Sequence, residues 1–396
     1  MTVPAEPAFP GTVLIETTEA LAVLCTRLAS AEFVTVDTEF MRERTYWPEL
    51  CVVQIAGPED VAVIDALAAG IDLAPLYALF DEPRVTKVFH AARQDLEIFH
   101  LRTGRLPKPL FDTQVAAMVA GFGDQVGYDA LVAALTGAAI DKAFRCSDWS
   151  ARPLTPQQIA YAAADVTHLR RAYVKLRARL ERNGRLAWVA EEMAALVDPA
   201  TYRLDPEDAW QRLRPRSTNR RFLGLLRAVA AWREREAQRL NIPRQRVVRD
   251  ETVLEVAAQA PTDVAGLLRA RGFRRSLAEG RSGAALLAAI AEAKALPEEA
   301  LPPAEDKRNG ARASPALVAL LKVLLAARCE EHDVAQRLVA SAEDLERLAA
   351  EDEPNLPCLQ GWRRELFGEA ALALKAGKVA LTAAGRRIQL IPLNAS

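Results

Sequence analysis

Two acidic residues follow a short β-branched stretch near the start of the chain. Residues 34–36 predict a strand, and Asp37 and Glu39 come at its end. Side chains alternate between the two faces of a strand, so both carboxylates point to the same side. Two carboxylates beside buried residues cost solvation free energy unless a cation or a partner group neutralises them. The pair therefore predicts a cation site or, as the simpler alternative, a solvated strand end.

Three residues elsewhere in the chain extend this pattern. Asp95 lies early in a helix expected near 91–101, where a single acid commonly complements the helix dipole. Tyr161 and Asp165 are four residues apart on a predicted helix and share one face, although a core aromatic also explains Tyr161 alone. Taken together, four carboxylates without neighbouring histidine or cysteine ligands favour Mg²⁺ or Mn²⁺.

The acidic set suits catalysis by two cations. Two such ions about 3.5–4 Å apart stabilise the attacking and leaving oxygens of an in-line phosphoryl displacement. We expect Asp37 to bridge both ions, and Glu39 and Asp165 to complete one of the two sites. Asp95 would hold the second ion through water, and Tyr161 would orient the attacking water. The expected cofactors are therefore two divalent cations, Mg²⁺ or Mn²⁺.

The chain from about 12 to 197 alternates between strand and helix signals. Strands are predicted at 51–55 and 61–64, and the turn at 57–60 joins them as a hairpin, so we expect a mixed sheet. Thr155 and Pro156 predict the start of a long helix. The other predicted elements are a strand at 85–88 and helices at 91–101, 113–119 and 128–135. The pattern indicates an α/β domain.

The order Asp-x-Glu, Asp, Tyr-x₃-Asp resembles the DEDD superfamily of 3′–5′ exonucleases. A sibling branch carries a histidine five residues before the last aspartate, where this chain has Ala160, so the resemblance is to the tyrosine branch. Four further segments are similar to the ribonuclease D family: 36–40, 46–48, 111–114 and 147–154.

This resemblance covers about Val13 to Val197. It implies a ribonuclease H-like mixed sheet flanked by helices. It also implies a hydrolase that removes nucleotides from RNA 3′ ends and releases 5′-phosphomonoesters.

Helical signals replace strand signals after about residue 199. Residues 217–293 resemble the HRDC domain (helicase and ribonuclease D, C-terminal), most clearly at 226–237. A second helical module near 315–376 is similar enough to indicate an internal repeat, but it lacks most of the basic residues. We expect three domains: a 3′–5′ exonuclease domain over 1–200, an HRDC domain over 215–296 and a second HRDC-like all-α domain over 312–384.

Positive charge is concentrated in one stretch of the chain. The formal net charge is −1, yet residues 203–249 hold thirteen arginines, no lysine and five acidic residues, a net charge of +8. Such a block favours a polyanionic partner. The candidates for RNA phosphate contacts are Arg216, Arg220, Arg221, Arg233, Arg244 and Arg246. For about half of them, pairing with Glu234 and Glu236 on a solvated helix is an equally good explanation.

An exonuclease also has to hold a single-stranded 3′ end. Phe40 and Met41 follow the acidic pair and are candidates for stacking on the terminal base, a contact worth about 1–3 kcal/mol per base. Core packing explains Phe40 equally well. Trp149 and Arg152 precede the helix that carries Tyr161, so they are candidates for contacts with the sugar–phosphate backbone.

Composition excludes several classes of protein. Five cysteines without a CxxC pair argue against a disulfide framework or a zinc site, and fit a reducing cytoplasm. Neither a signal peptide nor an apolar run of about 20 residues is visible. We expect a cytoplasmic monomer, without a membrane partner, that binds RNA; the resemblance implies transfer RNA precursors. The alternatives are a DNA 3′–5′ exonuclease, although no polymerase region follows, and a non-catalytic RNA-binding adaptor, although the acidic set is intact.

Overall fold

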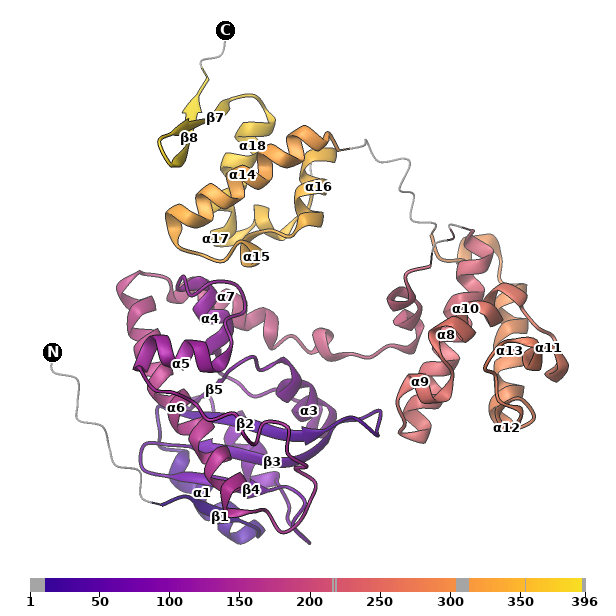
Figure 1. Cartoon of the computed structure of the whole chain (residues 1–396), viewed down its shortest axis with the longest axis horizontal. Helices are drawn as coiled ribbons and strands as arrows, with labels where there is room; N and C mark the ends of the chain where they lie inside the picture. The colour runs from indigo at the N-terminus through magenta and orange to yellow at the C-terminus, as the bar shows by residue number, and fades with distance from the viewer. Residues whose placement is uncertain (1–10, 216, 218, 304–312, 353, 394–396) are drawn as a thin grey trace. The chain divides into compact units, whose positions relative to one another are not determined.

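The computed structural model describes residues 11–215, 217, 219–303, 313–352 and 354–393 (Figure 1). By its internal contacts the chain divides into two compact units. The first unit comprises residues 1–39, 50–201 and 310–396, and the second comprises residues 40–49 and 202–309.

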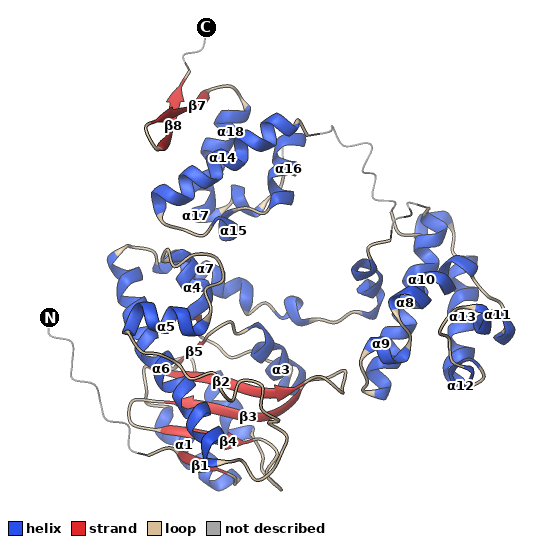
Figure 2. Cartoon of the chain, in the orientation of Figure 1, coloured by secondary structure: helices blue, strands red, loops and turns tan. Residues whose placement is uncertain are grey.

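A six-stranded mixed sheet lies in the first unit (Figure 2). From edge to edge its strands are β1 (Val13–Ile15), β4 (Val61–Asp65), β3 (Glu49–Ala56), β2 (Phe33–Met41), β5 (Thr86–Phe89) and β6 (Leu110–Asp112). Strands β3 and β4 pair antiparallel, whereas β1–β4, β2–β5 and β5–β6 pair parallel. The predicted hairpin and the mixed sheet are therefore confirmed. Every residue of β4 is buried, as expected for a strand covered on both faces.

Seven helices accompany this sheet in the described chain. They are α1 (Thr18–Leu28), α2 (Ala74–Asp81), α3 (Arg93–Thr103), α4 (Thr113–Val119), α5 (Tyr128–Thr136), α6 (Pro156–Arg182) and α7 (Leu186–Leu196). The long helix α6 packs against β4 and β5. It begins with Thr155 as its cap and a proline in its first turn, as the sequence predicts, and Gln158 completes a capping box. This cap fixes where α6 starts and therefore which residues of α6 reach the sheet.

A helical module completes the first unit. It contains α14 (Pro315–His332), α15 (Gln336–Val339), α16 (Ala342–Ala350), α17 (Gly361–Arg363), a π-helical turn at Arg364–Gly368 and α18 (Glu369–Lys375). Trp362 stacks on Trp188 of α7 with ring centroids 4.7 Å apart, and Arg363 pairs with Glu192 at 2.5 Å. Aromatic stacking and a largely buried ion pair thus join this module to α7.

One expectation about this module is wrong: strands do not stop after Pro199. Strands β7 (Val379–Ala384) and β8 (Arg387–Pro392) form an antiparallel hairpin. Their two-residue connection begins at Gly385, whose φ of 63° lies in the left-handed region that tight hairpin turns require. The glycine between two short apolar runs was the available signal.

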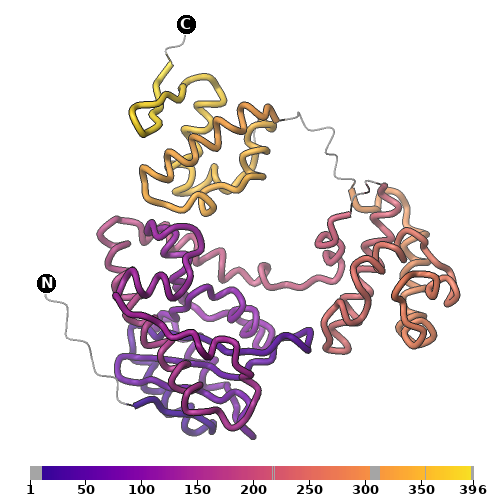
Figure 3. The backbone as a smooth tube through the Cα atoms, in the orientation of Figure 1, coloured from indigo at the N-terminus to yellow at the C-terminus, as the bar shows by residue number. Residues whose placement is uncertain are grey.

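The second unit is helical (Figure 3). After 3₁₀ turns at Pro199–Tyr202 and Pro206–Leu213, its helices are α8 (Arg220–Leu240), α9 (Arg244–Val247), α10 (Asp250–Gln259), α11 (Val264–Arg269), α12 (Arg275–Ala278) and α13 (Arg281–Ala295). A 3₁₀ turn at Glu298–Ala300 follows. Helix α8 contacts α10 and α13, and their apolar faces form the core of this unit.

The segment Phe40–Glu49 contributes to that core although it follows directly from the strand residues 33–39. Tyr46 is 5% exposed, and its hydroxyl donates a hydrogen bond to the carboxylate of Glu234. The side-chain oxygen of Asn241 accepts hydrogen bonds from the N–H groups of Tyr46 and Trp47 at 3.1 and 3.0 Å. Strand β2 therefore passes from one unit into the other.

The two helical modules share an order of elements. Helices α8 and α14 both end at a left-handed residue, Asn241 (φ 48°) and Asp333 (φ 51°). Each is followed by a four-residue helix and then by a longer one, α9–α10 in one module and α15–α16 in the other. This common order supports the internal repeat expected from the sequence.

Candidate active site

Three carboxylates from two elements meet beside the second half of strand β2, which continues past the acidic pair to Met41. Asp37 and Glu39 lie on one face of β2, and Asp165 reaches them from α6. Ligand oxygens of these three side chains all lie within 4.8 Å of one another. The two-residue spacing of Asp37 and Glu39 on the strand and the position of Asp165 on the helix therefore bring the three carboxylates together.

Asp95 approaches the same group from the first turn of α3. It is 6% exposed, and its carboxylate accepts a hydrogen bond from the hydroxyl of Thr38, which lies between Asp37 and Glu39 in β2. The charge of Asp95 raises the pKa of Glu39, and the charge of Asp37 raises the pKa of Asp95. The structure thus brings all four predicted acidic residues together, with Asp95 held beside the other three through Thr38.

The electrostatics of the four carboxylates are those of crowded like charges. Burial raises the pKa of Asp37 to about 6. Burial and neighbouring carboxylates raise the pKa of Asp165 to about 8 and that of Glu39 to about 9. Burial and Asp37 also raise the pKa of Asp95. None of the basic side chains that the structure describes forms an ion pair with these groups, so the site lacks the positive charge that a divalent cation would supply.

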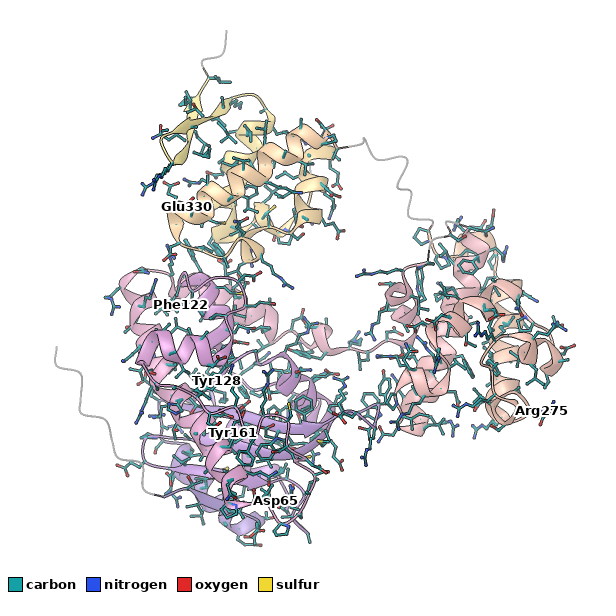
Figure 4. All side chains as sticks on the ribbon, in the orientation of Figure 1. Asp65, Phe122, Tyr128, Tyr161, Arg275 and Glu330 are labelled. Atoms are coloured by element: carbon teal, nitrogen blue, oxygen red, sulfur yellow. The ribbon has the colours of Figure 1, made fainter. Side chains whose placement is uncertain are left out.

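Tyr161 lies one turn before Asp165 on α6 and faces the same cavity of about 380 Å³ (Figure 4). Its hydroxyl hydrogen-bonds the carboxylate of Asp165. Burial and the carboxylates of Asp165, Glu39 and Asp37 raise the pKa of Tyr161, so the phenol stays protonated and acts as a hydrogen-bond donor.

Asp112 fixes the start of helix α3 and was not identified as a site residue from the sequence. One carboxylate accepts hydrogen bonds from the N–H groups of Ala91, Ala92, Gln114 and Val115 at 2.7–3.3 Å. Ala91 has a φ of 57°, a left-handed conformation that is unfavourable for alanine. Asp112 therefore stabilises the strained turn that leads into the helix carrying Asp95.

Tyr128 was also missed. From α5 its hydroxyl donates a hydrogen bond to the backbone carbonyl of Asp165, and its ring lies 5.3 Å from the ring of His90 (Figure 4). Both side chains line the cavity. No local spacing in the sequence signals this contact.

Two basic side chains also line the cavity. Lys142 and Arg145 line the cavity, and Lys142 pairs with Asp129 at 2.7 Å. Both lie just before the segment 147–154, so their position beside that motif was the available signal. The cavity is therefore lined by both acidic and basic side chains, a combination suited to a phosphate group and its counterions.

Trp149 and Arg152 do not have the environment expected of backbone-contacting residues. Trp149 is 2% exposed, with its ring centroid 6.1 Å from that of Tyr161. Arg152 makes a two-pronged ion pair with Asp65 at 2.7 and 2.6 Å and also donates to the carbonyl of Cys51. Burial of Trp149 and internal pairing of Arg152 position the loop before α6, and contact of these residues with the sugar–phosphate backbone stays a prediction.

Phe40 and Met41 follow Glu39 at the end of β2 and are both half-buried. Neither is among the residues that line the cavity. Their stacking on a terminal base stays a prediction.

Two protein-family models match the chain: a 3′–5′ exonuclease over residues 12–181 and an HRDC domain over residues 222–290. Ribonuclease D from Acidiphilium cryptum is 66% identical over 387 residues, covering 98% of this chain and 99% of that protein. Ribonuclease D from Gluconacetobacter diazotrophicus is 65% identical over 388 residues, with the same coverage. The chain belongs to the ribonuclease D family.

A solved structure of the ribonuclease D family agrees. Escherichia coli RNase D, an exoribonuclease involved in structured RNA processing, aligns with a TM-score of 0.79 and 33% identity, covering 92% of this chain and 99% of that one. The family resemblance and the fold class are confirmed. As a member of the ribonuclease D family, the chain is an exoribonuclease, a hydrolase of phosphodiester bonds.

Two of the predicted RNA-contacting arginines of this ribonuclease D family member serve the HRDC fold. Arg220 donates to the backbone carbonyls of Glu298 and Leu301 at 2.7 and 3.0 Å. Arg221 donates to the carbonyl of Leu296 at 2.6 Å. Their guanidinium groups hold the end of α13 and the following turn against the start of α8, and contact of these arginines with RNA stays a prediction.

Two further arginines form buried or half-buried ion pairs. Arg233, with its side chain 4% exposed, pairs with Asp250 at 2.6 Å. Arg244 donates to both carboxylate oxygens of Glu234 at 2.6 and 2.8 Å. Their charge is neutralised inside the HRDC domain, and contact of these two arginines with RNA stays a prediction. Among the six candidates, Arg246 is exposed and Arg216 lies outside the described residues.

Among the helices that the structure describes in this ribonuclease D family member, none has the length and apolar character needed to cross a bilayer.

Proposed function

We propose that the chain shortens RNA from its 3′ end by hydrolysis with two divalent cations, releasing 5′-mononucleotides. The observation that supports this most is the group of three carboxylates within 4.8 Å of one another, with raised pKa values and no cationic partner among the described residues. Carboxylate oxygens without histidine or cysteine fit Mg²⁺ or Mn²⁺.

The roles of the side chains follow from their places. Asp37, Glu39 and Asp165 would hold one cation, and Asp37 with Asp95 would hold the other. When bound, the cations lower the pKa of a water molecule and stabilise charge on the attacking and leaving oxygens. The Tyr161 hydroxyl, fixed on Asp165, hydrogen-bonds and orients the attacking water. Lys142 and Arg145 would contact the phosphates of the RNA 3′ end.

We further propose that the substrates are transfer RNA precursors with 3′ extensions and that the enzyme acts in the cytoplasm as a monomer. The relation to Escherichia coli RNase D, described as involved in structured RNA processing, supports a structured RNA substrate. We also propose three domains: the exonuclease domain at 1–200, the HRDC domain at 215–296 and the second HRDC-like domain at 312–384. The HRDC domain would then add affinity for RNA.

Digestion of a 3′-extended transfer RNA, with products sized at nucleotide resolution, tests this function. We expect stepwise loss of nucleotides from the 3′ end with Mg²⁺ or Mn²⁺, and none with a chelator. Asp37→Ala should abolish release and retain RNA binding, whereas the exposed control Glu59→Ala should cleave normally. Full activity of Asp37→Ala, or a strong preference for a matched DNA oligonucleotide, would contradict the proposal.

A further inference from the structure

The two helical modules differ at one position of their common order. Two residues after the left-handed residue that ends the first helix, the first module has Pro243 and the second module has Ala335. Both residues precede a four-residue helix and have similar backbone angles: φ −53° and ψ 139° for Pro243, and φ −67° and ψ 129° for Ala335. Proline fits this conformation but has no backbone N–H. The second module, α14–α18, therefore has an N–H group where the first module has none.

This N–H group binds the nuclease domain. Ala335 donates to the carbonyl of Met118 at 3.0 Å, in the last turn of α4, where carbonyls have no partner within the helix. Arg185, at the start of α7, donates to the carbonyl of Val119 at 2.8 Å and to that of Asp333 at 3.1 Å. The end of α4 is thus capped by the second helical module, directly through Ala335 and indirectly through Arg185.

The segment that follows α4 is held by the same module. Arg337 of α15 donates to the side-chain oxygen of Gln125 at 3.1 Å. At Gly121 the two parts of the chain lie so close that an added Cβ would clash with the carboxylate of Asp333. Gly121 and Gln125 have φ of 85° and 47°, in the left-handed region that is unfavourable for glutamine. A backbone conformation of this kind persists where surrounding contacts hold it in place.

Residues 118–127 lead directly into the wall of the active-site cavity. Tyr128 is the first residue of α5 and lines that cavity (Figure 4). Just before it, the carbonyl of Val126 accepts a hydrogen bond from Gln114, another lining residue, at 3.3 Å. The hydroxyl of Tyr128 donates to the backbone carbonyl of Asp165. A displacement of this segment would therefore change the position of Asp165.

We infer that the second helical module is a positioning element of the nuclease site. By holding residues 118–127 through Ala335, it fixes Tyr128 and, through Tyr128, the backbone of Asp165. Ala335 is a positioning residue, because it acts on the reaction only through these two. The inference rests on the proposed function, since it takes Asp165 as a cation ligand. It assigns the second module, which lacks most of the basic residues of the first, a role in hydrolysis.

The test is Ala335→Pro in the full chain. Proline is the residue of the first module and fits the φ of −67°, but it removes the N–H that binds Met118. We expect kcat for nucleotide release from oligoadenylate to fall about 10-fold, and the Mg²⁺ concentration for half-maximal rate to rise about 10-fold. KM for the RNA should stay within about twofold, because no group that binds RNA is lost.

The matched control is Ala342→Pro in the same module. Ala342 is exposed and is the first residue of α16, a position where proline suits the backbone and no N–H is needed. This variant should keep kcat within about twofold of the unmodified enzyme. Circular dichroism and melting temperature verify that both variants fold. Equal losses of kcat in the two variants, or no loss in Ala335→Pro, would overturn the inference.

Tyr128→Phe tests the other end of this path. In the Tyr128→Phe background, Ala335→Pro should lower kcat by less than about a further twofold, because both changes act on the same contact with Asp165. Losses that multiply would contradict the inference. If Ala335→Pro does not fold, Gln125→Ala takes its place, because it removes the acceptor of Arg337 without changing the charge.

Gln125→Ala should lower kcat about threefold at unchanged KM, and an unchanged kcat would overturn the inference. Failure of the proposed function has a different result. Nucleotide release as fast in chelator as with Mg²⁺ would contradict the two-cation chemistry, whereas the kcat values of the proline variants would still test the positioning role.

Discussion

The carboxylates beside the second half of β2 and the arginines of the HRDC domain are both clusters of like charge, but their surroundings differ. The carboxylates face one another, with Asp37, Glu39 and Asp165 within 4.8 Å and without a basic partner among the described residues. Arg233 and Arg244 each have an acidic partner at 2.6 Å. One cluster is left electrostatically unfavourable, and the other is neutralised.

This difference separates function from architecture. Buried like charges without partners lower the stability of the protein alone, and they persist where a ligand supplies the missing charge. A buried ion pair leaves nothing for a ligand, and removal of one partner is destabilising because the other charge stays buried. Whether a charged side chain already has a partner therefore distinguishes a functional residue from a structural one better than the sign of its charge does.

The largest expected effect is that of Asp165→Asn on turnover. The cation site would lose a ligand, and several kcal/mol of transition-state stabilisation correspond to at least about a thousandfold slower nucleotide release. Above pH 8, where Asp165 is ionised, the same change also removes one of the crowded like charges, so the metal-free protein should melt at a higher temperature there. Nucleotide release with Mg²⁺ and thermal unfolding in chelator measure both effects. A lower melting temperature than that of the unmodified protein would break the comparison.

The next effect is a loss of stability in Glu234→Gln. Burial alone would raise the pKa of Glu234, but hydrogen bonds from Arg244 and Tyr46 hold it below its usual value. The substitution leaves Arg244 without its anion and should lower the free energy of unfolding by about 3 kcal/mol, measured in urea. Glu207→Gln is the control, because Glu207 pairs with Arg235 on the surface and should cost less than about 0.5 kcal/mol. An equal loss of unfolding free energy in Glu234→Gln and Glu207→Gln would show that the buried ion pair of Glu234 with Arg244 does not stabilise the HRDC domain.

The third prediction concerns pH and metal together. The pKa values of Asp165 and Glu39 are raised to about 8 and about 9, so the folded metal-free protein holds protons that the unfolded chain has already lost. Its stability should therefore fall as pH rises from the ordinary carboxyl range toward 9. Mg²⁺ at 100 times its pH 8 dissociation constant should restore about 2.7 kcal/mol at pH 8, and the same Mg²⁺ concentration should restore less at pH 5. Melting temperatures with and without Mg²⁺ across this pH range test whether stability falls as pH rises. The dependence of stability on pH would be reversed if the carboxylates had basic partners.

The smallest expected effect is that of Arg221→Gln on RNA affinity. Its guanidinium already donates to the carbonyl of Leu296, so we expect a change of less than about twofold in the dissociation constant and a loss of about 1 kcal/mol in stability. A tenfold loss of affinity at unchanged stability would return this arginine to the RNA-binding surface. Titration of labelled RNA and urea unfolding of the same preparation decide between the two.

The carboxylate set was predictable because its geometry is largely local. Residues two apart on a strand and four apart on a helix share a face whatever the rest of the fold does, which places Asp37 with Glu39 and Tyr161 with Asp165. The family resemblance supplied the fold that brings these pairs together. The cap of α6 and the β3–β4 hairpin were visible for the same local reason.

Other parts of the site depend on contacts that sequence spacing does not encode. Tyr128 acts on the backbone carbonyl of a residue 37 positions away, and Asp112 on backbone N–H groups at 91 and 92. The number of arginines predicted the positive charge of this part of the chain. It did not predict which arginines have intramolecular partners, because the partners of Arg220 lie 78–82 positions later. Hydrogen bonds of this kind are set by tertiary packing.

The exchange of a chain segment between the two units has a consequence for biosynthesis. Tyr46 and its partner Glu234 are separated by 188 residues. At about 5–20 residues per second, a ribosome takes roughly 10–40 s to make that interval. During that time Tyr46 and Trp47 lack their final contacts, although most of the strands of the nuclease sheet have already been synthesised. The HRDC core is finished by a segment that left the ribosome long before the rest of that core.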